Sequence, residues 1–303
     1  MDELDKANRL AAAEKSTATR RAYAADFAIF SSWCSERDVK PLPAEPAIIS
    51  AFLAFEVGRG RRPSTLGRRL AAIQFWHLTA GHEPPTTAEP VRATLRGIRR
   101  VFGTARRRKA PAIADLAKAM ARSTPPTLVG LRDRALILLG FAGALRRSEL
   151  VALDVSDLVR TEKGLLVTIR RSKTDQEAEG ATIAIPRGGQ DCPVKALETW
   201  LLAASVTEGP VFRPIGRSGK VLHRRLCDRA VTMTIKRYAK QTGLDAKAFS
   251  AHSLRSGFLT SAAANGASIF KMMDVSRHKS IDTLRAYVRD AELFTDHAGA
   301  GLL

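Results

Sequence analysis

The apolar residues of the first hundred positions recur at intervals of three or four, and this spacing stops at a short basic segment. It predicts four helices: the first behind a Ser16 cap, the second after Pro46, the third from Ser64 and the fourth through Val91. Residues 103–111 then break the periodicity with glycine, proline and a run of basic residues, a composition typical of a linker. We therefore expect two domains.

The linker assigns residues 1–102 to an N-terminal helical bundle and residues 112–303 to a second domain. In the second domain the apolar stretch 128–141 predicts a helix, and residues 165–169 and 182–185 predict two short strands. Further helices are predicted over residues 193–204, 222–241, 252–265, 269–275 and 281–291. The expected fold class is mainly α: a four-helix bundle followed by a mostly helical domain with a small antiparallel β-sheet.

The chain carries 49 lysines and arginines against 30 aspartates and glutamates, a formal net charge of +19. This surplus predicts a polyanionic partner such as double-stranded DNA, although it does not separate an enzyme from a packaging protein. Arginines gather around the predicted third and fourth helices and in the linker. A single run of this kind is usually a solvated face, whereas two runs on adjacent helices favour phosphate contacts. The candidate DNA contacts are Arg61, Arg62, Arg68, Arg69, Arg96, Arg99, Arg100, Arg106, Arg107 and Arg108.

Several classes of protein are not expected. Cys34, Cys192 and Cys227 are too few and too scattered for a disulfide framework or a zinc site, which fits a reducing cytoplasm. No stretch of about 18 uncharged apolar residues occurs, so we expect neither secretion nor a membrane partner. No Gly-Lys-Ser/Thr phosphate loop and no paired-carboxylate metal site is found, so we expect no cofactor and no metal. The predicted location is cytoplasmic, in association with the nucleoid.

Two pairs of polar residues share a spacing of three. Arg146 and Glu149 lie on one helical face, and alone they would be an ordinary surface ion pair. His252 and Arg255 repeat the spacing on a helix that is otherwise apolar, and alone they too would most often be structural. Tyr287, taken alone, would be a plain core aromatic. None of these features identifies a site by itself.

The order of the polar residues along the chain is more specific than any one of them. They are Arg146, Lys173, His252, Arg255, His278 and Tyr287. This order resembles the tyrosine recombinases, also called the phage integrase family, which use Arg, Lys, His-x-x-Arg, His or Trp, and Tyr. The Leu-Arg-x-Ser-Glu-Leu surroundings of Arg146, the position of Lys173 between the predicted strands, and the nine-residue step from His278 to Tyr287 all fit the family.

The resemblance is detailed over residues 112–290, whereas the N-terminal bundle resembles the family's core-binding, SAM-like domain by position and character only. Arg147 adjoins the first arginine, and Arg146 is chosen because it has the right spacing to Glu149. One departure is Arg277, which stands where the family often has glycine and either alters the local turn or adds a phosphate contact.

The residue types suit the chemistry that the resemblance implies. A phosphodiester in its transition state carries extra negative charge on its non-bridging oxygens, and the planar forks of Arg146 and Arg255 can hold those oxygens. His252 and His278 can donate hydrogen bonds or move a proton, because an imidazole titrates near neutral pH.

Tyr287 is the expected nucleophile, which would attack phosphorus and form a covalent phosphotyrosine. The family resemblance assigns this linkage to the 3′ phosphate, makes a 5′ oxygen the leaving group, and makes Lys173 the acid that protonates it. Glu149 is expected to orient its neighbours.

The expected function is therefore site-specific DNA recombination, with cleavage and rejoining of duplex DNA through a Holliday junction. The resemblance implies a homotetramer on two DNA sites and allows accessory DNA-bending proteins. Two alternatives stay open: a type IB topoisomerase, which shares the phosphotyrosine chemistry, and a non-catalytic DNA-binding architectural protein. The last residues after Tyr287 either dock in a neighbouring protomer or fray.

Overall fold

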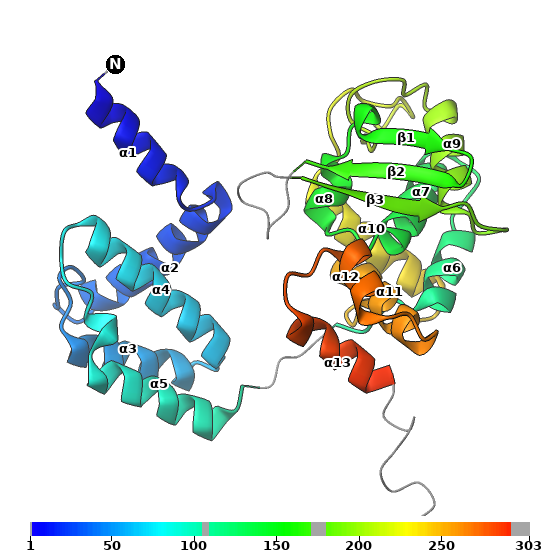
Figure 1. The fold of residues 1–303 in the computed structure, drawn as a ribbon. Coiled ribbons are helices and arrows are strands. Elements are labelled where there is room, and N and C mark those ends of the chain that lie inside the picture. The colour runs from blue at the N-terminus through cyan, green and yellow to red at the C-terminus, as the bar shows by residue number, and fades with distance from the viewer. Residues whose placement is uncertain (1, 105–108, 171–179, 292–303) are drawn as a thin grey trace, which may run out of the picture. The chain divides into compact units, whose positions relative to one another are not determined.

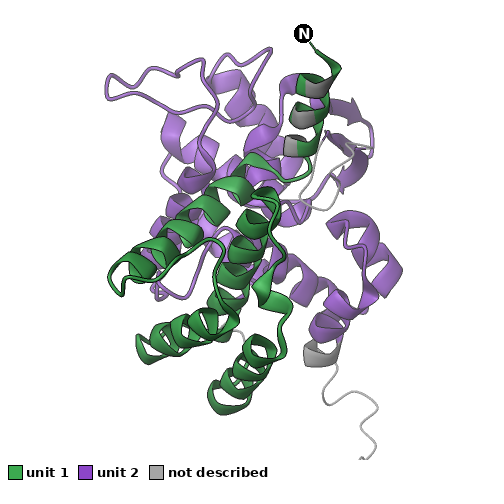
Figure 2. Ribbon diagram, turned by 90° about the vertical axis from the view of Figure 1, so that its left-hand side faces the viewer, with its two compact units in different colours: residues 1–107 green, residues 108–303 purple. Residues whose placement is uncertain are grey.

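The computed structural model describes residues 2–104, 109–170 and 180–291. The chain divides into two compact units, residues 1–107 and residues 108–303 (Figures 1 and 2). Each unit has its own hydrophobic core. Among the described residues, no helix has both the length and the apolar character needed to cross a membrane.

The first unit is helical. Its elements are α1 (Glu3–Ala13), α2 (Thr17–Ser35), α3 (Pro46–Gly58), α4 (Pro63–Thr79), the 3₁₀ turn η1 (Pro85–Thr87) and α5 (Glu89–Phe102). The four predicted helices are α2 to α5, and Ser16 caps α2 by accepting a hydrogen bond from the Thr19 N–H. Their core is built on Phe30, Phe52 and Leu66, all fully buried. Helix α1 was not predicted, and its side chains, where the structure describes them, are exposed.

The second unit is mostly helical, with one small sheet (Figure 1). Its elements are α6 (Ala114–Arg122), α7 (Leu128–Ala142), α8 (Arg147–Ala152), the 3₁₀ turn η2 (Val155–Asp157), β1 (Leu158–Thr161), β2 (Gly164–Ile169), β3 (Ala181–Pro186), α9 (Pro193–Ala203), α10 (Asp228–Gln241), α11 (His252–Ala264), α12 (Ile269–Ser276) and α13 (Ile281–Ala291). The predicted fold class is confirmed.

The sheet has the strand order β1-β2-β3, with both pairs antiparallel. In the central strand, Leu165, Val167 and Ile169 alternate with more exposed residues and enter the core that also holds the buried helix α7. Val167 pairs with Ile183 on β3, so the buried faces of the two strands are in register.

Strand β1, helix α6 and the 3₁₀ turn η2 were not predicted, and one predicted helix was too long. Strand β1 is short and mostly exposed, and α6 is a brief helix without a long periodic pattern. The helix predicted over 222–241 begins only at Asp228. Before it, the Leu222 and Leu226 N–H groups bond to the carbonyls of Pro214 and Phe212, which keeps that segment out of the helix.

The chain enters the second unit directly across α11. The Ala110 N–H donates to the Ala248 carbonyl, and the Ala112 N–H donates to the Ser253 carbonyl at 2.8 Å. This close approach requires Gly257, because a Cβ there would lie 1.8 Å from the Ala112 oxygen. The entering segment therefore fixes the face of α11 beside Arg255.

Candidate active site

Arg146 and Glu149 meet at the start of α8. The Glu149 carboxylate accepts the Arg146 backbone N–H at 2.8 Å and the Arg146 Nη1 at 2.6 Å, so it closes a capping box on the helix. Glu149 is 2% exposed. The neighbouring Arg147 instead forms an exposed ion pair with Asp228 on α10. The spacing of three, on which Arg146 was chosen, thus corresponds to a direct contact.

Arg255 comes from α11 and is 1% exposed, although it carries a guanidinium. Its Nη1 donates to the Ala144 carbonyl at 2.7 Å, which ties α11 to the turn just before Arg146. Burial first, and then the positive charges of Arg146 and Arg277, lower the pKa of Arg255 to about 9. The side chain is therefore still protonated near neutral pH, and its charge lies in a poorly solvated position.

His278 follows α12 and contacts Arg255. Ser276 Oγ donates to the Met272 carbonyl, so it accepts from His278 Nδ1, 2.8 Å away. This network places the imidazole proton on Nδ1 and leaves Nε2 to accept from Arg255 Nη2 at 3.3 Å. Burial, followed by the charges of Arg255 and Arg146, lowers the pKa of His278 to about 4. The ring is neutral at pH 7.

His252 is the first residue of α11, one turn before Arg255, and retains an exposed face. Partial desolvation, and then the charges of Arg255 and Arg146, lower the pKa of His252. Its own charge in turn lowers the pKa of His278. The two imidazoles therefore lie on the same cluster of guanidiniums.

Tyr287 stands on α13, half-buried, against the apolar cluster of Leu259, Met272 and Leu284. Its phenol interacts electrostatically with Arg255, whose pKa it raises. The other tyrosines have packing environments, as predicted: the Tyr238 hydroxyl donates to buried Asp133 at 3.1 Å, and Tyr23 packs on Phe75. Tyr287 is the tyrosine that meets the clustered guanidiniums.

Arg277 is a site residue that sequence reasoning noted only as a departure. Its backbone is left-handed, with φ 57° and ψ 42°, a conformation that favours glycine. Its side chain turns inward, where Nη1 donates to the carbonyls of Val275 and Gly143, and Nη2 donates to Glu149 Oε2 at 2.7 Å. The backbone at this departure is thus left-handed, and its guanidinium is bound to Glu149.

Glu149 is therefore shared by two arginines. Burial alone would raise the pKa of this carboxyl, but Arg277 and Arg146 together hold the pKa below its ordinary value. Arg146, Arg255 and Arg277 thus form a cluster of three guanidiniums around one buried carboxylate, with His278 and Tyr287 beside it.

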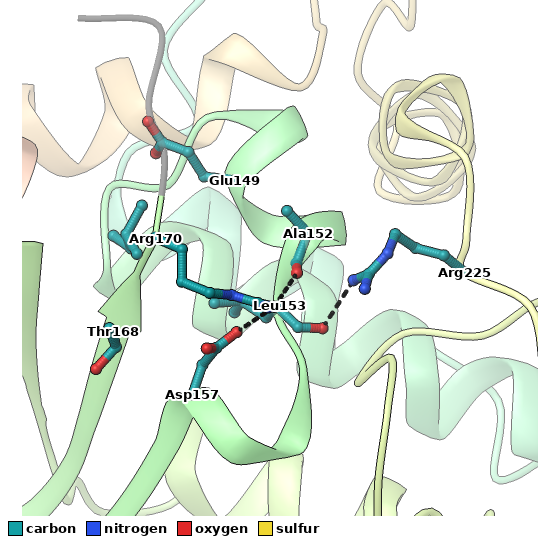
Figure 3. Close-up of a pocket in the computed structure, with 8 residues that line it drawn as sticks. Glu149, Ala152, Leu153, Asp157, Thr168, Arg170 and Arg225 are labelled. Carbon is teal, nitrogen blue, oxygen red and sulfur yellow. Dashed lines mark hydrogen bonds and ion pairs between the residues drawn. The ribbon is translucent and has the colours of Figure 1, made fainter. Parts of the chain in front are cut away.

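A cavity of about 320 Å³ opens next to Glu149 and runs along the end of β2. Figure 3 shows Arg170 extending along it toward Asp157 and the Ala152 carbonyl, while Arg225 reaches the Leu153 carbonyl from the other side. These contacts anchor the last described residue before the segment that carries Lys173. Lys173 itself, like residues 292–303, lies outside the described residues.

The candidate DNA contacts of the first unit divide into three groups. Arg62, Arg99 and Arg100 are exposed. Arg61, Arg68 and Arg96 are exposed but ion-paired, with Glu56, Asp26 and Glu89 respectively. Arg69 was wrongly predicted, because it is 4% exposed and forms a buried ion pair with Glu56 that keeps it from any phosphate. Arg106, Arg107 and Arg108 lie outside the described residues.

Within the described ranges, no three His, Cys, Asp or Glu side chains form a group able to hold a metal ion. Cys34 and Cys192 are buried free thiols, and Cys227 is an exposed one.

The sequence profile of the phage integrase family matches residues 111–293. The chain is 39% identical to an integrase/recombinase xerD homolog from Selenomonas ruminantium, over 97% of this chain and 87% of that protein. The chain belongs to the phage integrase family. It is also 27% identical to the tyrosine recombinase XerD of Listeria monocytogenes, over 91% of this chain and 89% of that protein.

The fold of this integrase family member matches that of a lambda integrase dimer solved on a COC′ core site. The TM-score is 0.64 at 18% identity, over 95% of this chain and 76% of the other. The family membership predicted from the polar residues is confirmed: the chain is a tyrosine recombinase, an enzyme of site-specific recombination that cleaves and rejoins DNA. The relatives favour neither a type IB topoisomerase nor a non-catalytic DNA-binding protein.

Proposed function

We propose that Tyr287 is the nucleophile of this recombinase. Its phenolic oxygen attacks a phosphorus of duplex DNA, forming a bond to the 3′ phosphate as the bond to the 5′ oxygen breaks. The reverse attack by a 5′ hydroxyl rejoins the strand and releases the tyrosine. The observation that carries this proposal is the convergence of three guanidiniums and two imidazoles beside a half-buried tyrosine.

Arg146 and Arg255 are the proposed ligands of the non-bridging phosphate oxygens. The charge of Arg255 is buried and only partly balanced, so an arriving phosphate would find a donor that has already lost its water. The two side chains come from α8 and α11, which the Ala144 contact holds together. Glu149 holds Arg146 in place as an ionised carboxylate, because the pKa of Glu149 lies below its ordinary value.

His278 is the proposed acceptor of the phenol proton. The ring is neutral at pH 7, and its Nε2 lone pair bonds only weakly to Arg255 at 3.3 Å. A phosphate that draws the Arg255 guanidinium away would free this lone pair for Tyr287. The added negative charge would also raise the pKa of His278 toward neutrality. His252, on the exposed side, is the proposed hydrogen-bond donor to the phosphate.

Lys173 is the proposed acid that protonates the leaving 5′ oxygen, a role that rests on the family resemblance. Arg170, three residues earlier, is held by Asp157 and by Asp154, so the segment with Lys173 starts from a fixed point beside Glu149.

The remaining proposals concern DNA and assembly. Residues 1–102 would serve as the core-binding domain and residues 112–303 as the catalytic domain, with the basic linker 103–111 along the DNA. Exposed Arg61, Arg62, Arg99 and Arg100 would bind phosphates, each lowering the slope of log affinity against log salt by about 0.9. Four protomers on two sites would exchange strands through a Holliday junction, in the cytoplasm at the nucleoid, with or without DNA-bending proteins.

The test uses a duplex recovered from random-sequence DNA by binding to the protein, nicked near its centre so that the cleaved fragment diffuses away. Wild-type protein should form an SDS-resistant adduct with the nicked duplex. Tyr287→Phe should bind the duplex equally well and form none. Tyr238→Phe, a matched change at a packing tyrosine, should form adducts at the wild-type rate. Adducts from the Tyr287→Phe protein would remove Tyr287 from the mechanism.

A further inference from the structure

The turn after α12 holds an arginine where its backbone favours glycine. Arg277 has φ 57°, in the left-handed region that a side chain disfavours. The arginine nevertheless turns inward, is 9% exposed and forms three hydrogen bonds. An unfavourable backbone conformation and a buried charge are both costly to the fold. Their occurrence at one residue indicates that Arg277 has a function.

The contacts of Arg277 connect two separate parts of the proposed site. On one side its backbone directly precedes His278 and leads into α13, which carries Tyr287. On the other side its Nη2 bonds to Glu149 Oε2, the same oxygen that accepts the Arg146 backbone N–H. Glu149 Oε1 is left to bind the Arg146 guanidinium at 2.6 Å.

We infer that Arg277 is a positioning residue, which holds the Glu149 carboxylate from the His278 side and thereby fixes Arg146 relative to His278 and Tyr287. This inference rests on the proposed roles of Arg146 and Tyr287. Arg277 acts through Glu149 and does not itself need to touch DNA. Because the bond spans α8 and the α12–α13 turn, it places the phosphate ligand and the nucleophile in one frame.

The charge of Arg277 gives this role a signature in pH dependence. Glu149 faces Arg146 from its own helix, Arg277 from the α12–α13 turn and Arg255 from α11. On the cavity side it is accompanied by Arg170, Arg225 and Asp157. Loss of Arg277 removes the largest of the effects that lower the pKa of Glu149, so the pKa of this carboxyl would lie higher than in the wild type. A protonated Glu149 loses its hold on Arg146, so cleavage would fail at a higher pH than in the wild type.

The decisive variants are Arg277→Gly, which suits the left-handed backbone, and Arg277→Lys, which keeps the charge without the planar fork. Adduct formation on the nicked, binding-selected duplex is measured from pH 5 to pH 9 at saturating DNA. Arg277→Gly should slow adduct formation about tenfold, the effect of losing one hydrogen bond to a charged group. The acid limb of its pH–rate profile, where the rate of adduct formation falls with falling pH, should lie at higher pH than in the wild type. Its DNA affinity should change less than about twofold. Arg277→Lys should restore the wild-type acid limb and part of the rate.

Glu149→Gln supplies the control for the pH shift, since it removes the carboxyl that is meant to titrate. In this background Arg277→Gly should move the acid limb no further. A shift that persists there comes from His252 or His278 and contradicts the inference. Should the glycine variant fold incompletely, Arg277→Gln replaces it, because it keeps part of the aliphatic stem and removes the charged guanidinium.

The two levels of the proposal fail differently. If wild-type protein forms no adduct, the proposed function is wrong. If wild-type protein forms adducts and Arg277→Gly matches it in both rate and acid limb, only the role of Arg277 is wrong. A loss of DNA binding in proportion to the loss of rate would also overturn the inference, because it would make Arg277 a DNA ligand.

Discussion

Each unit of this recombinase buries a cluster of charges, and the two clusters are balanced differently. In the first unit, the buried guanidinium of Arg69 forms ion pairs with two buried carboxylates, Asp26 and Glu56. The same carboxylates also pair with the exposed side chains of Arg59, Arg61 and Arg68. In the second unit, Arg146 and Arg277 form ion pairs with buried Glu149. Arg255 is also buried, but it donates to the Ala144 carbonyl and to His278 and forms no ion pair with any residue that the structure describes.

The difference separates a structural cluster from a site that awaits a ligand. In the first unit the buried guanidinium has carboxylate partners: burial lowers the pKa of Arg69, and the charge of Asp26 acts against that shift. In the second unit burial and neighbouring cations lower the pKa of Arg255 to about 9. A surplus of buried positive charge destabilises the free protein and is relieved when an anion such as a phosphodiester binds.

The largest expected effect is on catalysis in the second unit. Arg255→Gln should slow adduct formation by about 10² to 10³, the range for removing a donor to a developing oxyanion. Its melting temperature should stay equal to that of the wild type or rise, because the variant removes a buried, incompletely paired charge. A large fall in melting temperature would make Arg255 a structural residue like those of the first unit.

The balanced cluster should respond in the opposite way. Arg69→Met leaves Glu56 buried beside fewer charges and should lower the free energy of unfolding by about 3 kcal/mol, measured by urea denaturation. Arg96→Met, which breaks an exposed pair with Glu89, is the matched control and should change it by less than about 1 kcal/mol. The adduct rate of folded Arg69→Met protein on saturating DNA should equal that of the wild type. Equal losses of unfolding free energy in Arg69→Met and Arg96→Met would show that the buried ion pair of the first unit is not structural.

Sulfate should stabilise the second cluster by supplying the missing negative charge. At a concentration 100 times its Kd, a bound anion adds about 2.7 kcal/mol of stability. The rise in melting temperature with sulfate, relative to chloride at matched ionic strength, should shrink in Arg255→Gln and persist in Arg69→Met. An equal rise in all three proteins would reflect general salting-out rather than a site.

The smallest expected effect is a titration. NMR of the imidazole ring should show that the pKa of His278 is about 4 without DNA, and that it rises when sulfate binds. Because an unfolded histidine titrates near 6.5, the folded state loses stability as pH falls from about 6.5 to about 4. His278→Gln should therefore show a shallower fall of melting temperature over that range. An unperturbed pKa would show that the cationic cluster does not act on the ring.

The sequence predicts the helical elements that carry long apolar patterns, and it predicts the pairs that lie three residues apart. The contact of Arg146 with Glu149 follows from that spacing. Burial of Arg69 was also open to prediction, since it lies three residues after Leu66 and four before Ile73 on the core face of α4.

Other features were beyond such local patterns. The bond from Arg277 to Glu149 joins residues 128 positions apart, and no spacing along the chain reports it. The left-handed turn that makes it geometrically feasible is a property of the backbone between α12 and α13. Strand β1 is short and exposed, so its pairing with β2, rather than its own side chains, defines it.

The central claim, that Tyr287 forms the covalent bond to DNA, is tested most directly by mapping the adduct. Wild-type protein trapped on the nicked duplex is digested with nuclease and trypsin, and the nucleotide-bearing peptide is sequenced by mass spectrometry. The prediction is a nucleotide on Tyr287, within the four-residue tryptic peptide from Ala286 to Arg289. A nucleotide on Tyr238, Tyr23 or any other residue would contradict the account.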